Sequence, residues 1–101
     1  MQSRLEIHDL ASGENRLVLE TAAHFEAPNW SRDGSHLLVN GGGRLYRVVL
    51  SAAPQLQLID TGLAIACNND HGLSPDGQFL VISDNGVDGQ SCIHILPSAG
   101  G

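Results

Sequence analysis

The sequence is short of charge, of cysteine and of long apolar runs, and each shortage excludes a class of protein. Charged residues make up 16% of the 101 residues, too few for a coiled coil or a long solvated helix. Cys67 and Cys92 are too few and too far apart for a zinc ribbon or a disulfide scaffold, so we expect two unpaired thiols. No apolar run is long enough to span a membrane.

Positive charge is also scarce, with 5 lysines and arginines against 11 aspartates and glutamates and a net charge of −6. Nucleic-acid binding generally needs a basic patch, so we expect no nucleic-acid partner. Residues 1–10 alternate charged and apolar side chains, unlike a signal peptide, which predicts a cytoplasmic protein. The periplasm becomes the expected compartment if a signal segment is missing from this chain. The apolar content of 42% is sufficient for one small folded domain.

The sequence does contain an internal repeat. Residues 29–34 (NWSRDG) and 72–77 (GLSPDG) align at an offset of 43 residues, and the apolar segments that follow them also align. Each copy then reaches a glycine-rich turn, at 41–43 and 84–89, and continues into a strand-like segment. A repeat of about forty residues that holds four short strands is typical of a β-propeller blade.

The local signals are those of strands joined by tight turns, with no sustained helical period. Residues 4–8 alternate polar and apolar side chains, as in a strand with one buried face. The Asp-Gly pairs at 33–34 and 76–77 lie between apolar runs and are typical of tight hairpin turns. We expect nine strands, near residues 3–8, 16–20, 27–31, 36–40, 44–50, 55–60, 70–74, 78–83 and 92–96.

The Trp-Ser-x-Asp-Gly and Leu-Ser-Pro-Asp-Gly elements, each followed by an apolar strand, resemble the repeat of TolB-like propellers. This family is related in architecture to the WD-repeat proteins. Residues 67–77 (CNNDHGLSPDG) are the most characteristic stretch and are similar to bacterial TolB-like proteins. The resemblance implies an all-β fold of four-stranded antiparallel propeller blades, about two of them in this chain.

The length of the chain does not complete a propeller. We expect one partial domain over residues 1–101, with blade-like units near 1–22, 23–62 and 63–101. Two outer strands, then a full blade, then three strands would leave unpaired sheet edges. We therefore predict a homo-oligomer, in which three copies join head-to-tail into the six-bladed ring usual for TolB-like propellers. The alternative is that the chain is a piece of a longer propeller.

Polar residues that precede two of the expected inner strands are the candidate ligand-binding residues. The resemblance implies that this position faces the central channel of a propeller, where ligands bind. The candidates are His24 and Glu26 before the first Ser-x-Asp-Gly element, and Asn68, Asn69, Asp70 and His71 before the second.

Asp70 and His71 are also candidate metal ligands, since carboxylate and imidazole groups commonly bind divalent cations. Related propeller lyases that act on pectin fragments use such a site. The alternative interpretation is that both side chains form hydrogen bonds within the blade and hold its turn. No other cofactor is expected.

The remaining residues form no complete catalytic set. Ser31 and Ser74 lack the glycine that follows the strained elbow of serine hydrolases. Trp30 is expected to pack in the core between blades rather than to support a sugar. Two functions remain. We favour a protein- or peptide-interaction module over a metal-dependent propeller that binds or cleaves carbohydrate at a His/Asp channel site. The sequence leaves open whether the chain is an enzyme.

Overall fold

The computed structural model describes residues 2–86 and 89–100 and contains nine strands and no helix in that part of the chain. The expected all-β fold is confirmed, and each of the nine expected strands is present. Val87 and Asp88 of the expected glycine-rich turn lie outside the described residues. None of the described residues forms a helix that could cross a membrane. The strands are β1 (Ser3–His8), β2 (Asn15–Thr21), β3 (Glu26–Trp30), β4 (His36–Gly41), β5 (Arg44–Val49), β6 (Leu56–Leu58), β7 (Cys67–Leu73), β8 (Phe79–Asp84) and β9 (Cys92–Pro97).

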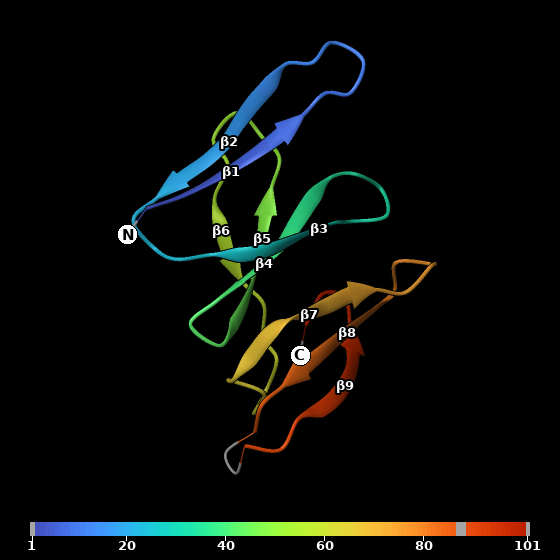
Figure 1. Ribbon diagram of the computed structural model, residues 1–101. Helices are drawn as coiled ribbons and strands as arrows, with labels where there is room; N and C mark the ends of the chain where they lie inside the picture. Colours follow the sequence, from blue (N-terminus) through green and yellow to red (C-terminus); the bar gives the residue numbers. More distant parts are fainter. Residues whose placement is uncertain (1, 87–88, 101) are drawn as a thin grey trace.

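The strands form three antiparallel sheets that follow one another along the chain (Figure 1). The first sheet contains β1 and β2, the middle sheet contains β3 to β6 in chain order, and the third contains β7 to β9. One four-stranded sheet between sheets of two and three strands is consistent with partial propeller blades. The two outer sheets leave strand edges without a neighbouring strand among the described residues.

Alternating side chains of the middle sheet form two hydrophobic cores. On one face, Leu37 and Val48 pack with Val18 of the first sheet. On the other face, Leu38 packs with Leu80 of the third sheet. Because successive residues of a strand point to opposite faces, the apolar run of β4 contributes to both cores.

The Ser-x-Asp-Gly elements form the turns that precede β4 and β8. The Asp33 carboxylate accepts hydrogen bonds from the Ser35 amide at 3.0 Å and from the Ser31 hydroxyl at 2.8 Å. Hydrogen bonds from Ser35 and then from Ser31 lower the pKa of Asp33 to about 2. Gly34 has a φ of 74°, which favours glycine. Asp76 occupies the same place in the second turn. Its carboxylate accepts hydrogen bonds from the Ser74 hydroxyl and from the Gln78 amide.

Trp30 is not part of either core. Its side chain is 51% exposed on β3, so the expectation that it packs between blades is wrong. The first sheet has only two strands, and these leave the Trp30 side chain half-exposed.

Candidate functional site

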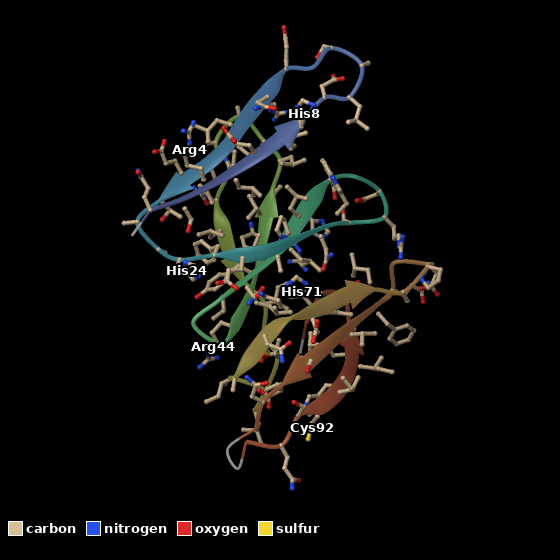
Figure 2. The ribbon with its side chains drawn as sticks, in the orientation of Figure 1. Arg4, His8, His24, Arg44, His71 and Cys92 are labelled. Carbon is tan, nitrogen blue, oxygen red and sulfur yellow. The ribbon has the colours of Figure 1, made fainter. Side chains whose placement is uncertain are left out.

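A polar groove of about 390 Å³ lies where β3 of the middle sheet meets β7 of the third sheet. Five of the six candidate residues line it, and they come from both sheets. In Figure 2, His24 lies at the start of β3 and His71 lies between the two sheets. The lining residues are His24, Glu26, Asn40, Gly41, Gly42, Gly43, Cys67, Asn68, Asn69 and Asp70.

Irregular backbone in both inner strands directs these side chains into the groove. The pairing of β3 with β4 shifts register between Glu26 and Asn29, and that of β7 with β8 shifts between Cys67 and His71. Ala27, within the first irregularity, has a φ of 55°, a region that residues other than glycine seldom occupy. A bulge breaks strict alternation, which is why the consecutive residues 68–70 all reach one groove.

Glycine is required where the β4–β5 turn meets the neighbouring loops. A Cβ atom on Gly41 would lie 2.3 Å from the backbone oxygen of His24, and one on Gly43 would lie 2.2 Å from that of Ile65. Gly43 also has a φ of 81°, and its carbonyl accepts a hydrogen bond from the Cys67 amide at 2.9 Å. Only glycine allows this close approach, which forms one side of the groove.

A chain of hydrogen bonds joins the two inner strands beneath the groove. His24 contacts the carboxylate of Glu26 through Nε2. Hydrogen bonds from His24 and then from Asn69 lower the pKa of Glu26, which keeps it ionised at neutral pH. The Asn40 amide nitrogen donates to Oδ1 of Asn69 at 2.9 Å. The Nε2 atom of His71 lies 3.0 Å from Oδ1 of Asn40, so the chain continues from Glu26 to His71.

The charge on Glu26 determines which nitrogen of His71 carries a proton. An ionised carboxylate only accepts, so Asn69 presents its NH₂ group to Glu26 and its oxygen to Asn40. The oxygen of Asn40 then faces Nε2 of His71, which must donate. Burial lowers the pKa of His71, so the ring is neutral at pH 7 and its Nδ1 atom has a lone pair.

Asn29 completes the network from β3. Its side-chain oxygen lies 2.5 Å from Nδ1 of His71. A neutral ring that donates through Nε2 has no proton at Nδ1, so a hydrogen bond there requires the NH₂ end of the Asn29 amide to face the ring. The two ends of an asparagine amide have nearly the same shape, and their orientation follows from the partners. His71 therefore connects β3, β4 and β7.

This geometry does not favour a metal site at His71 and Asp70. Both ring nitrogens of His71 face asparagine side chains, which leaves no lone pair for a cation without rearrangement. Within residues 2–86 and 89–100, no three histidine, cysteine, aspartate or glutamate side chains come close enough to hold a metal ion. Cys67, which is buried, and Cys92, which is exposed, are both free thiols.

Sequence reasoning missed five lining residues, which are Asn40, Gly41, Gly42, Gly43 and Cys67. The glycines were expected only to form a turn, and the structure shows that Gly41 and Gly43 are also required for close packing against other loops. Asn40 follows the apolar run of β4 and is only 6% exposed. A polar residue at the end of a buried strand is a signal that could have indicated the network, because buried polar groups need partners.

No family model matches the chain. It is 50% identical over all 101 residues to an uncharacterized protein of Agrobacterium fabrum strain C58, of which it covers 34%. It is 49% identical to a protein of Agrobacterium tumefaciens that was provisionally named TolB and whose structure is solved. That match has a TM-score of 0.92 and covers 97% of this chain and 35% of the other.

The chain has a TolB-like fold. It spans about a third of the length of both proteins that it matches. The likeness supports a propeller-type interaction module.

Proposed function

We propose that this chain is part of a propeller-type interaction module and that its groove between β3 and β7 binds a peptide segment of a partner protein. The ligand in the groove is a positively charged side chain or an amino terminus. The observation that carries the proposal is the convergence of Glu26, Asn68, Asn69 and Asp70 from two sheets on one groove.

The chemistry of the lining supports a cationic ligand. Glu26 is held ionised, and Asp70 is exposed at the opposite side of the same groove. The backbone amide of Asp70 donates to Oδ1 of Asn68 at 2.9 Å, which holds this segment of β7 in place. Carboxylate and amide oxygens accept hydrogen bonds from an ammonium or guanidinium group, and a groove arranged before binding loses less entropy when it is filled.

The test is a titration with two glycine peptides that differ only at a central lysine or glutamate, followed by the amide NMR shifts of the protein. We expect the lysine peptide to shift the amides of residues 24–26, 40–43 and 67–70, and the glutamate peptide to leave them unchanged. Asp70→Asn removes one charge, which near a solvated surface is worth about 1 kcal/mol or a fivefold rise in Kd.

Glu14→Gln is the matched control, because it removes the same charge from an exposed position outside the groove. It should leave the Kd for the lysine peptide unchanged. The proposal fails if the lysine peptide causes no shifts in the groove, or if Asp70→Asn and Glu14→Gln weaken binding equally. The second result would mean that net charge alone attracts the peptide.

A further inference from the structure

A second polar groove, of about 400 Å³, lies at the other end of the interface between the middle and third sheets. The groove between β3 and β7 adjoins the end of β4, whereas this one adjoins the start of β4 and the two Ser-x-Asp-Gly turns. Both of its walls belong to described strands and turns. We call it the basic groove, and its lining residues are Ser31, Arg32, Asp33, His36, Arg47, Leu73, Asp76, Gly77, Ser98 and Ala99.

Three basic side chains gather in this groove, although the chain as a whole has a net charge of −6. Arg47 pairs with Leu38, and His36 precedes Leu38 by two residues, so His36 and Arg47 lie on the face of the middle sheet that packs against the third sheet. Arg32 comes from the first Ser-x-Asp-Gly turn and lies against the second, where a Cβ atom on Gly77 would be 3.3 Å from its Cγ.

Hydrogen bonds across the groove hold both arginines in place and leave them with further donors. Arg32 donates through Nε to the Ser74 carbonyl and through Nη2 to the Leu73 carbonyl, each at 3.0 Å. Arg47 donates through Nη2 to the Ser98 carbonyl at 2.9 Å. A guanidinium group has more N–H donors than these bonds use. Since no buried side-chain nitrogen of the described residues lacks a partner, the remaining donors are open to solvent.

The carboxylates of the groove do not neutralise this charge. Asp33 and Asp76 each accept hydrogen bonds from donors of their own turn, and within the described part of the chain neither forms an ion pair with an arginine. The pKa of His36 is lowered first by burial and next by Arg47, and Asp33 raises it by less. At the His36 ring, the positive charge of Arg47 therefore outweighs the negative charge of Asp33.

We propose that the basic groove is a second binding site, which takes an anionic oxygen group, a carboxylate or a phosphate, through the free N–H donors of Arg32 and Arg47. The planar guanidinium group matches the spacing of two oxygens on such a group. Because the carbonyls of the third sheet already hold both arginines, little side-chain freedom is lost when the anion binds. The ligand has the opposite charge to that of the groove between β3 and β7.

Sulfate is the first probe, because it has the tetrahedral oxygens of phosphate and stays doubly charged at every pH used. The full chain is titrated with about 1 to 100 mM sulfate at an ionic strength held constant with sodium chloride. We expect the amide NMR shifts of residues 31–36, 47 and 73–77 to change, with a Kd in the millimolar range. The glutamate peptide is the second probe. A response to sulfate alone identifies a phosphate site, and a response to the peptide alone identifies a carboxylate site.

His36 supplies a readout that a purely structural role of the arginines would not change. A bound anion offsets the charge of Arg47, so saturating sulfate should raise the pKa of His36, followed by the NMR shifts of its ring protons. Arg47→Gln should raise the Kd for sulfate at least about fivefold. Arg16→Gln is the matched control, since it removes the same charge from an exposed position on β2 outside the basic groove.

The outcomes separate a binding site from general attraction of anions. No response of the basic groove to either probe would overturn the proposal. So would equal effects of Arg47→Gln and Arg16→Gln on the Kd, because net charge alone would then attract the anion. Far-UV circular dichroism checks that each variant is folded. Should Arg47→Gln not fold, Arg32→Gln changes an exposed side chain of the same groove and should raise the Kd at least about threefold.

Discussion

Alanine at Gly43 should destabilise the protein more than alanine at Gly42, although the two residues are neighbours in one turn. Both have a positive φ, of 59° at Gly42 and 81° at Gly43. The left-handed backbone costs alanine about 1–2 kcal/mol at either position. The loss of glycine's freedom in the unfolded chain is also common to both variants and cancels in the comparison.

The surroundings of the two residues differ. A Cβ atom on Gly42 meets nothing within 4 Å, whereas one on Gly43 would lie 2.2 Å from the backbone oxygen of Ile65. Ordinary contact therefore requires the loop at residues 65–66 to move by about 1 Å, since non-bonded heavy atoms pack at about 3.5 Å. That movement strains the 2.9 Å hydrogen bond from the Cys67 amide to Gly43, which is worth about 0.5–1.5 kcal/mol.

We therefore expect Gly43→Ala to lower the free energy of unfolding by at least about 1 kcal/mol more than Gly42→Ala. Urea denaturation followed by far-UV circular dichroism measures this difference. The amide NMR shifts of residues 67–70 should also change in Gly43→Ala and not in Gly42→Ala. Equal free energies of unfolding for the two variants would refute the close approach of the β4–β5 turn to Ile65.

Two further predictions concern the network and the core. Burial lowers the pKa of His71 below its usual 6.5, so the unfolded chain binds that proton more readily and the free energy of unfolding falls as the pH is lowered through 6.5. The slope is at most about 1.4 kcal/mol per pH unit for one group, and His71→Gln should reduce it in urea titrations between about pH 5 and 8; an unchanged slope would contradict a buried neutral ring. Burial also lowers the pKa of His36. The free energy of unfolding of His71→Gln should therefore still fall in part as the pH is lowered. Leu80→Ala, at a fully buried position between two sheets, should cost about 2–5 kcal/mol in the same assay, whereas Leu63→Ala in an exposed loop should stay within about 0.5 kcal/mol.

The turns and the strands could be predicted from the sequence because their causes are local. Asp33 and Asp76 accept hydrogen bonds from residues two positions away, so the Ser-x-Asp-Gly element contains its own partners. The alternation of residues 4–8 likewise indicates a strand with one buried face, and Leu5 and Ile7 pack toward the core. Five of the six candidate residues line one groove, because the repeat predicts corresponding positions on the two inner strands.

The partners of His71 could not be predicted, because they are distant in sequence. The ring was expected to hold a turn within its blade or to bind a metal, and it contacts Asn29 and Asn40, which lie 42 and 31 residues away. Trp30 was expected in the core, but its burial depends on how far the first sheet extends. Neither the partners of His71 nor the extent of the first sheet is visible in a local sequence pattern.

The sequence by itself determined the repeat, the nine strands and the Ser-x-Asp-Gly turns, because turn chemistry and alternation act over a few residues. Only the tertiary structure decided which faces are covered. Val81 and Leu38 occupy the same place in the repeat, yet one is exposed and the other is buried. The difference arises because another sheet packs on Leu38 and no sheet of the described residues packs on Val81. It is a matter of neighbours in space rather than of position along the chain.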